Sequence, residues 1–495
     1  MTTISDVADL AGVSAATVCN VINDSRPVSP GTRRRVERAI LKLRFRPKRA
    51  GRAPARRTKA QSGGAASEWP AGLRMSPAGQ RARDWTNGRP GTAAGEMALA
   101  LLRLVRAAQP VSRADIARRF GVHRSTVTDL VRPLLAEGLL RETEMPAAAG
   151  EARMGRPGTG LEFTDEIYCI GLSLGIRQSQ AGAVTVGGRL LAEAAFDTPR
   201  DKKVALRLIR ATVADLRAGV RGKKLVSVGV SVPGPTCAER RRLLYAPHLG
   251  WRDVAVADAL RFRPRVVAGA RAAAGARGVP VIIENDARAA ALYEARTRSV
   301  EEDDDWGDFI LVRAGTGIGV GVVRGGEVYR GAKATEGWAG EFGHMTIVAD
   351  GRPCACGGRG CWESYASTGS AVSQYMGDRA MMRSRAPRFL EIVARAEAGE
   401  ARARATLARV GGYLGIGIAN LISGLGVSRV VVSGRLVHGW KFISGPLHEA
   451  IGRSMAGRLA EWTVVPGRAA GAGLGGALEV AIDHYLVSGR KADGY

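Results

Sequence analysis

The sequence predicts an α/β protein whose first third is helical. At 495 residues the chain exceeds the usual size of one domain, so two or three folded units are expected. From Tyr168 onward, strand-like runs such as LVSVGVSVPG alternate with helical segments, which is the pattern of α/β architecture. Two strand-rich beginnings, near Tyr168 and near Phe309, predict two similar halves within this region.

Positive charge is concentrated toward the N-terminus. The formal net charge is +27, and residues 1–160 hold 28 lysines and arginines against 13 acidic residues. This balance suits a polyanion partner, although the arginine and alanine content also indicates a GC-rich coding background. Nine basic residues and no acidic one lie between Lys42 and Lys59. We expect residues 47–93 to be a basic flexible linker, its first part being either an arm on DNA phosphates or a solvated tether.

The N-terminus lacks the basic and apolar regions of a signal peptide, and no stretch approaches 18 uninterrupted apolar residues. We therefore expect a cytoplasmic protein, associated with the bacterial nucleoid, that has no membrane partner. In a reducing compartment, the cluster of Cys354, Cys356 and Cys361 predicts a metal site rather than a disulfide.

Residues 1–46 are predicted to form a first helix-turn-helix. Val7, Leu10 and Val13 make an apolar stripe across Gly12, which is typical of a helix followed by a tight turn. A second helix is expected to begin near Ser14. The geometry suits the major groove of DNA, and an all-α protein-interaction module is the alternative.

Over roughly residues 2–47 this segment resembles the headpiece of the lactose-repressor family, on the pattern DVA..AGVS..TV..V.N and the stretch VSP.TR..V..AI. The resemblance implies that the second helix reads bases. The positions that inherit this role are Ser14, Ala15, Ala16, Thr17 and Asn20. The chain departs from the family at Asn20, where arginine is usual, and at Gly51 and Pro54, which disfavour the family's hinge helix.

Residues 94–163 are predicted to form a winged helix-turn-helix. One helix starts at Glu96, a second is capped by Ser112, and a third runs from Arg124 to Glu137. A strand begins at Leu139 and Leu140, and a tight turn at Gly155, Pro157 and Gly158 completes the wing. The expected base and phosphate contacts are Arg124, Ser125, Thr126, Thr128 and, on the wing, Arg156. A two-helix structural dock is the alternative.

The strongest chemical signal is the segment EFGHMTIVADGRPCACGGRGC. His344 precedes Cys354 by ten residues, and Cys356 and Cys361 follow within seven. Three thiolates and an imidazole satisfy the tetrahedral preference of zinc and leave no open position, so a structural zinc site is predicted.

This segment, with GEFGH and CWESYAS, resembles the ROK (repressor, ORF, kinase) sugar-kinase family over roughly residues 166–486. The winged element looks like the one that precedes the sensor in ROK regulators. The resemblance implies a two-lobed actin-like, hexokinase-like (ribonuclease H-like) fold over residues 164–490. It also implies a sugar pocket made by Asn285, Asp286, Glu341, His344 and Glu363. Carboxylates and an imidazole oriented by a metal suit the recognition of sugar hydroxyls.

The phosphate-binding parts of the family pattern are incomplete. Where the kinases have Asp-x-Gly-Gly-Thr, this chain has Ser173 to Arg177, and a double glycine becomes Ser433 and Gly434. The loop RAGTGIGVG, with Gly315, Thr316 and Gly317, is intact. We therefore expect no catalytic residue. An active kinase would use Asp286 as general base, with ATP and magnesium.

These observations predict a DNA-binding transcriptional regulator of carbohydrate metabolism, with repression as its expected mode of action, that binds double-stranded DNA and a sugar or phosphosugar. A homodimer or homotetramer is expected, because half-site recognition gains from two-fold symmetry. Two alternatives remain open: an active hexose kinase with a DNA-binding N-terminus, and a DNA-binding protein whose sensor no longer binds sugar.

Overall fold

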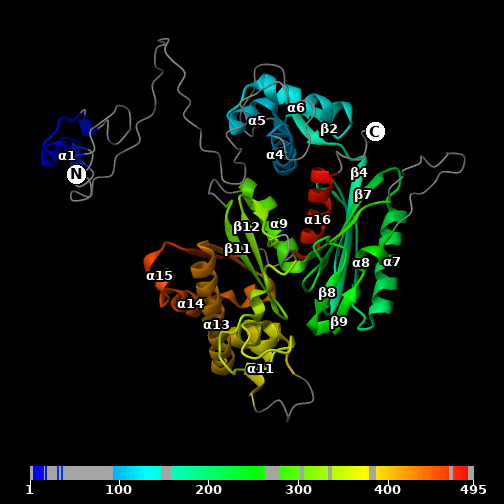
Figure 1. Ribbon diagram of the computed structural model, residues 1–495, viewed down its shortest axis with the longest axis vertical. Helices are drawn as coiled ribbons and strands as arrows, with labels where there is room; N and C mark the ends of the chain where they lie inside the picture. Colours follow the sequence, from blue (N-terminus) through cyan, green and yellow to red (C-terminus); the bar gives the residue numbers. More distant parts are fainter. Residues whose placement is uncertain are drawn as a thin grey trace, which may run out of the picture. The chain divides into compact units, whose positions relative to one another are not determined.

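A computed structural model describes the architecture of the protein (Figure 1). The residues that it describes are 4–15, 17–18, 31–32, 35–36, 39, 93–145, 158–261, 278–301, 306–332, 337–377, 386–467 and 472–488. The chain forms two compact units, Met1–Ala65 and Ala66–Tyr495, and each is considered by itself.

The first unit has a small apolar core. Helix α1 (Ile4–Ala11) ends at Gly12, whose φ of 61° is the left-handed conformation that a tight turn requires. The core residues are Val7, Ala8, Ala11, Val18, Val36 and Ala39, with Val13 packed against them. Leu10, which the sequence placed on the apolar stripe, is instead 45% exposed. Ala8 and Ala11 take its place because they lie on the same side of α1 as Val7.

The second unit opens with the predicted winged element. Its helices are α4 (Ala93–Ala108), α5 (Arg113–Phe120) and α6 (Arg124–Ala136), and its sheet has the order β1 (Val111–Ser112), β3 (Thr159–Phe163), β2 (Leu140–Glu144). Ser112 caps α5 by accepting a hydrogen bond from the backbone of Asp115, and Gly121 ends that helix at φ 63°. The first helix begins at Ala93, earlier than predicted.

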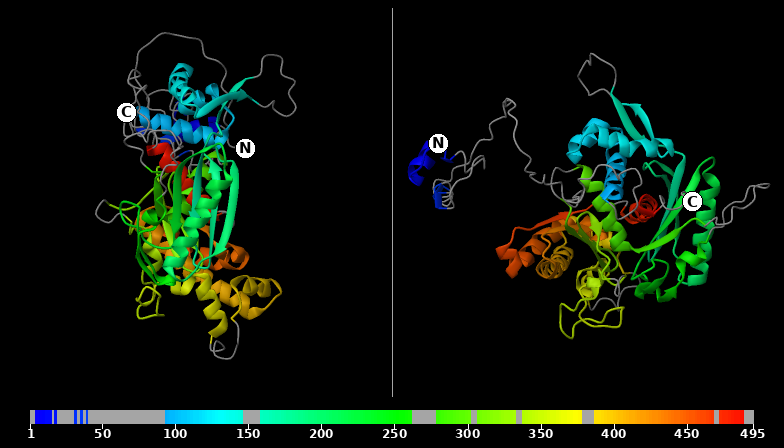
Figure 2. Two further views of the ribbon diagram at one scale, coloured as in Figure 1. Left: turned by 90° about the vertical axis from the view of Figure 1, so that its right-hand side faces the viewer. Right: turned by 45° about the horizontal axis from the view of Figure 1, so that its top comes forward.

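Strands β2 and β3 form an antiparallel ribbon that extends beyond the three helices (Figure 2). Gly158, predicted in the tight turn, lies beside the ladder, since its carbonyl accepts a hydrogen bond from the backbone of Met145. Gly155 and Pro157 lie outside the described residues. The ribbon therefore runs farther toward its tip than the sequence suggested.

The rest of the unit contains two five-stranded sheets with the same strand order. The first comprises β4 (Ile167–Ser173), β5 (Gln178–Thr185), β6 (Leu190–Asp197), β7 (Lys224–Val232) and β10 (Val281–Asn285), and the second comprises β11 (Phe309–Ala314), β12 (Ile318–Arg324), β13 (Glu327–Val328), β14 (Arg429–Ser433) and β15 (Thr463–Pro466). In each, an antiparallel meander is extended by two parallel strands, giving β10-β7-β4-β5-β6 and β15-β14-β11-β12-β13. The prediction of two similar halves beginning near Tyr168 and Phe309 is confirmed.

Two helices lie between these sheets. Helix α16 (Ala472–Ser488) packs on β4 and β7, while α9 (Asp286–Glu301) packs on β11 and β12, and the two helices contact each other (Figure 1). The outer face of the first sheet is covered by α7 (Lys202–Gly219), as Figure 2 shows. A two-stranded sheet, β8 (Leu243–Ala246) with β9 (Trp251–Val254), and the short α8 (Val256–Ala259) complete this half.

The second half carries additional helices, namely α10 (Glu363–Ala366), α11 (Thr368–Met376), α12 (Phe389–Glu397), α13 (Ala401–Leu425), α14 (Trp440–Gly452) and α15 (Met455–Leu459). Helix α13 is long and apolar enough to span a membrane by length and composition alone. Much of it is buried in the apolar core of this half, as expected of a core helix in a globular domain.

The winged element shares one apolar core with the two-sheet part of the unit. Met97, Leu101 and Val105 of α4 pack in the same cluster as Cys169 of β4 and Ile482 of α16. The boundary predicted between residues 94–163 and 164–490 therefore stays a prediction, because no break in the core separates the two segments.

Candidate functional site

The predicted sugar residues begin where β10 meets α9. Asn285 ends β10, and its side-chain oxygen accepts hydrogen bonds from the backbone of Ala287 and Arg288, so that it caps α9. Its amide nitrogen donates to the carbonyl of Gly234 in the VPG loop, at 3.2 Å. Asp286 starts α9 and is 27% exposed at its side chain. The fold thus uses Asn285 to fix the turn that presents Asp286.

A buried cation beneath this turn was not singled out from the sequence. Arg288 is 1% exposed and pairs with Glu284 at 2.9 Å. It also donates to Thr236 and to the carbonyl of Gly337. Burial opposes ionisation of Glu284, but the guanidinium groups around it, Arg240 first, hold its pKa at about 2. Glu284 lies on β10 and Arg288 on α9, so this ion pair crosses the turn between the strand and the helix, and the spacing in IIENDARAA does not by itself indicate it.

Glu341 lies near the same turn, and the region around Asn285, Asp286, Glu341 and Glu363 is called the cleft below. Glu341 opens a short 3-10 helix, Glu341–His344, that follows the segment held by Arg288. Burial raises the pKa of Glu341 to about 7, and the charges of Asp286 and Glu363 add to this effect while Arg288 opposes it. The structure therefore brings three of the predicted carboxylates into mutual electrostatic range.

Glu363 lies between the cysteine cluster and the glycine loop. One carboxylate oxygen is 3.2 Å from Cys354 Sγ and 3.6 Å from His248 Nε2, and the other accepts from the backbone of Ile318. A Cβ on Gly317 would approach this carboxylate within 2.5 Å, so the loop needs glycine there. Although burial opposes it, the contact with His248 lowers the pKa of Glu363, and the same contact raises that of His248. His248 joins the site from the YAPHLGW segment.

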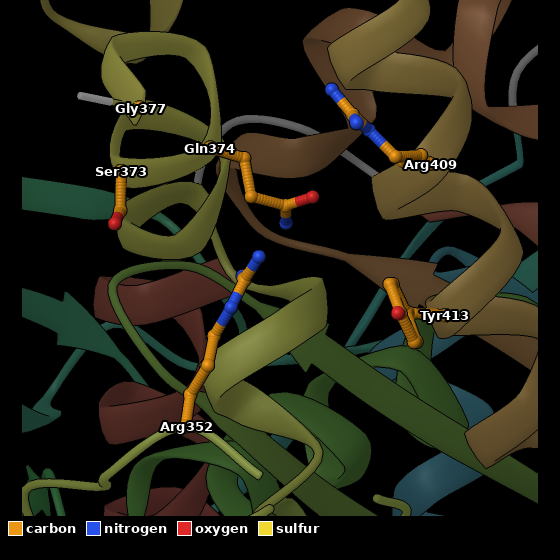
Figure 3. Close-up of a pocket in the computed structure, with 6 residues that line it drawn as sticks. All are labelled: Arg352, Ser373, Gln374, Gly377, Arg409 and Tyr413. Atoms are coloured by element: carbon orange, nitrogen blue, oxygen red, sulfur yellow. The ribbon is translucent and has the colours of Figure 1, made fainter. Parts of the chain in front are cut away.

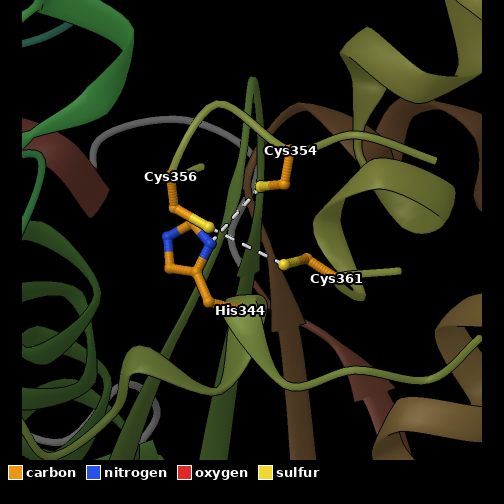
Figure 4. Close-up of side chains that lie close together, drawn as sticks. All are labelled: His344, Cys354, Cys356 and Cys361. Carbon is orange, nitrogen blue, oxygen red and sulfur yellow. Dashed lines mark hydrogen bonds between the residues drawn. The ribbon is translucent and has the colours of Figure 1, made fainter. Parts of the chain in front are cut away.

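The predicted metal ligands converge (Figure 4). One ligand atom from each of His344, Cys354, Cys356 and Cys361 lies within 4.8 Å of the others. His344 Nδ1 is 3.6 Å from Cys354 Sγ, and Cys356 Sγ is 3.8 Å from Cys361 Sγ. Two sulfurs bound to one tetrahedral zinc ion lie roughly 3.8 Å apart, given Zn–S bonds of about 2.3 Å. The spacing and the donor set fit a closed site for zinc.

The loop that carries the cysteines is bent by glycines. Gly357 and Gly360 have φ values of 98° and 74°, and a Cβ on Gly360 would lie 1.8 Å from the carbonyl oxygen of Val348. Burial raises the pKa of the Cys354 and Cys361 thiols. Without a cation these thiols would therefore stay protonated at neutral pH, and a bound metal ion would supply the charge that stabilises their thiolate forms.

The altered phosphate-binding positions lie at the ends of two strands, one in each sheet. Ser173 ends β4 and is 9% exposed. Ser433 ends β14, is fully buried, and lies in register with Arg313. Arg313 itself donates through Nε to Asp286 Oδ2 at 3.2 Å. From the sequence, Arg313 was only the first letter of an intact loop, and nothing in the local pattern revealed that its side chain reaches Asp286.

A separate hollow of about 450 Å³ lies beside the cysteine loop (Figure 3). Its lining residues are Arg352, Ser373, Gln374, Gly377, Arg409 and Tyr413. None of the predicted sugar residues lines it. The hollow is therefore distinct from the cleft, which includes Asn285 at the end of β10 in the first half.

The predicted DNA contacts whose side chains are described lie at exposed or half-buried positions. On α6, Arg124 and Ser125 are exposed and Thr126 and Thr128 half-buried, while Val127 is fully buried in the core. In the first unit, Ser14 and Ala15 are exposed and Thr17 is half-buried. The hydroxyl of Ser14 accepts from the backbone of Thr17 at 3.2 Å, the bond expected of a cap where a helix starts near Ser14. Ala16, Asn20 and Arg156 lie outside the residues whose side chains are described.

Ion pairs join α4 of the winged element to α16, and an arginine of α9 shares one of the carboxylates. Arg103 donates to Asp483 of α16 at 2.7 Å, and Arg296 of α9 donates to the same carboxylate at 3.0 Å. Glu327 pairs with both of these arginines. One turn along, Arg106 binds both oxygens of Glu479. Because α9 starts at Asp286, a single helix connects the cleft with this junction.

Comparison with known proteins places these features in a family. Residues 169–484 match the ROK family, residues 3–48 match the lacI family of bacterial regulatory proteins, and residues 96–144 match the IclR helix-turn-helix domain. A xylose repressor of Bacillus subtilis is 25% identical over 394 residues, covering 78% of this chain and 94% of that protein.

Two solved structures support the fold. A ROK family transcriptional regulator, a homolog of the E. coli MLC protein, covers 80% of this chain and 98% of its own, with a TM-score of 0.62 and 22% identity. A ROK family glucokinase from Streptomyces griseus, in complex with glucose and AMPPNP, covers 63% and 99%, with a TM-score of 0.53 and 26% identity. The predicted α/β, two-lobed fold is confirmed. Since the family match spans well over half of its residues, the chain belongs to the ROK family.

Proposed function

We propose that the protein is a sugar-responsive, DNA-binding transcriptional repressor of carbohydrate metabolism, cytoplasmic and nucleoid-associated. The observation that carries the proposal is the junction between the cleft and the winged element. Helix α9 begins at Asp286 and carries Arg296, which shares the carboxylate of Asp483 with Arg103 of α4. The similarity to a xylose repressor over most of both chains supports the same function.

The cleft would bind the sugar through its carboxylates. Asp286 and Glu341 would accept hydrogen bonds from hydroxyls, Asn285 would position Asp286, and Glu363 would join the sugar rim to the metal loop. Zinc, held by His344 and the three cysteines, would supply a fixed frame for Glu363 rather than chemistry, since four protein ligands complete its coordination.

Coupling requires that sugar favour one arrangement of the two halves over another. Closure of the sheets around a ligand would move α9 and α16 relative to each other, and Asp483 is the carboxylate that both helices share with α4. The exposed face of α6, with Arg124 and Ser125, would then change its fit to a DNA half-site. A symmetric dimer would present two such faces.

Phosphoryl transfer is the second candidate function, because the loop around Gly315 is intact and a relative of known structure is a glucokinase. Asp286 would then be the base. Its ion pair with Arg313 and the serine at position 173 favour binding without transfer. ATP consumption across a panel of hexoses, at the turnover of a working kinase, would establish this alternative instead.

The proposal is tested in two steps. Footprinting across the genome of the source organism identifies the DNA sites that the protein binds. Fluorescence anisotropy then measures its affinity for duplexes that contain those sites. We expect sugar to change that affinity, and Arg124→Ala to weaken binding by about tenfold or more. Arg221→Ala, at an exposed arginine in the sensor, is the matched control and should bind normally. An absence of specific sites, or equal binding by both variants, would contradict the proposal.

A further inference from the structure

The cleft contains a cation that the sugar residues do not explain. Arg313 contacts Asp286 through Nε alone, at 3.2 Å. The side chains of the two residues are 26% and 27% exposed, so the pair borders open space rather than the core. Within the described part of the chain, the structure records no hydrogen-bond partner for the two terminal nitrogens of Arg313. This guanidinium therefore has donors to spare.

Hydroxyl groups lie near the free donors of Arg313. A Cβ built on Gly473, near the start of α16, would lie 3.1 Å from Ser173 Oγ and 3.8 Å from Arg313 Nη2. Ser173 and Arg313 thus flank one backbone position that has no side chain. Ser231, in register with Ser173, is 1% exposed, and among the described residues its hydroxyl has no hydrogen-bond partner. A second hydroxyl therefore lies beside Ser173 on the adjacent strand.

We propose that Arg313 determines ligand specificity by binding an anionic substituent, a phosphate ester or a carboxylate, on the sugar that occupies the cleft. This inference rests on the proposed function. The terminal nitrogens of a guanidinium match pairs of phosphate or carboxylate oxygens. Ser173, which also lies beside Gly473, would donate a further hydrogen bond. Asp286, held through Nε, would keep the guanidinium plane in place.

If Arg313 only neutralised the negative charge of Asp286, the expected effect of its removal on sugar binding would differ. Asp286, Glu341 and Glu363 already make the cleft acidic, and a neutral sugar needs their oxygens as acceptors. A cation that only paired with Asp286 would compete with the sugar for one of these acceptors. Its removal would then change the binding of neutral and anionic sugars equally. Selective recognition of an anion is what separates the two roles.

The test uses the full chain and calorimetric titration with glucose, mannose and galactose, with their 6-phosphates, and with the corresponding uronates. We expect the wild type to bind one anionic form at least about tenfold more tightly than its neutral parent, as a hydrogen bond to a charged group contributes. The phosphate and uronate arms identify the anion. The preference should also shrink as salt is raised, a measurement that needs no variant.

Arg313→Met should retain binding of the neutral sugar and lose the preference, and Arg313→Gln provides a second variant should the first not fold. Arg324→Met, at the exposed end of β12, is the matched control and should keep the preference for the anionic sugar. Equal wild-type affinities for neutral and anionic forms, or a preference that survives in Arg313→Met, would overturn the inference. If a neutral sugar binds as tightly as its anionic form and changes the affinity for the operator, only this inference is overturned. Binding of no sugar at all overturns the proposed function as well.

Discussion

Replacing Asp483 by asparagine is the most informative single change, because two arginines from different helices depend on this carboxylate. The side chains of Asp483, Arg103 and Arg296 are 17%, 17% and 10% exposed. Breaking a buried ion pair by removing one partner costs about 3–5 kcal/mol, since it leaves charge without compensation. Glu327 would still pair with both arginines, and it is 52% exposed, so we expect the lower end, about 3 kcal/mol.

The dependence on pH gives this prediction a second signature. Burial opposes ionisation of Asp483, but Arg296 and Arg103 hold its pKa far below its usual 3.8. A carboxyl group with a lowered pKa contributes stability that is present above its unfolded pKa and is lost as the pH falls toward the folded value. The gap between wild type and Asp483→Asn should therefore narrow below about pH 4.

Urea unfolding of the full chain, followed by circular dichroism at several pH values, would measure both effects. Glu449→Gln is the matched control, because its ion pair with Arg453 on α14 joins side chains that are 62% and 75% exposed. Such a pair contributes under about 0.5 kcal/mol. A cost for Asp483→Asn below about 1 kcal/mol, or a gap that does not change with pH, would refute the reasoning.

Three further changes test the site and its support. Chelation, or Cys356→Ser, should remove about one zinc per chain by metal analysis and lower the melting temperature, and an unchanged melt in a zinc-free protein would contradict the assignment. Burial raises the pKa of Glu341 to about 7, so the folded protein favours the protonated carboxyl group. The stability that this preference contributes is present at low pH and is lost as the pH rises from about 4.5 to 7. Thermal melts should then show Glu341→Gln gaining on wild type over that range, and a constant difference would exclude the effect. A Cβ on Gly417 would meet the ring of Trp362 at 2.0 Å, so Gly417→Ala should cost about 1–3 kcal/mol, whereas Gly412→Ala, with open space on the same helix, should cost nothing.

Much of this arrangement was predictable because it depends on local pattern. The caps at Ser112 and Gly121, the two strand-rich beginnings and the cysteine spacing each follow from a few neighbouring residues. The tertiary partners of long side chains were not. Nothing adjacent to Arg313 or Arg103 in the sequence indicates that they reach Asp286 and Asp483, because those contacts span 27 and 380 residues.

Leu10 was misplaced for a related reason. Periodicity says which residues are able to share a face, but the neighbouring elements decide which face is covered. In the first unit Val18, Val36 and Ala39 cover the side of α1 that carries Val7, and Leu10 is left outside. A similar limit applies to functional residues. The sequence predicted Asn285 as a sugar contact, but its side-chain oxygen caps α9.

The two helices between the sheets have a mechanical consequence. Helices α9 and α16 contain 16 and 17 residues, so each is a rod of about 25 Å, at 1.5 Å per residue, without an intervening loop. A tilt of about 5° at the end near Asp286 would shift the far end by roughly 2 Å, which is the scale of helix movements in known switches. Transmission of the movement would then depend on the stiffness of α9. A glycine or proline introduced midway along α9 would leave sugar binding unchanged, but the helix would bend there and the movement would not reach α4.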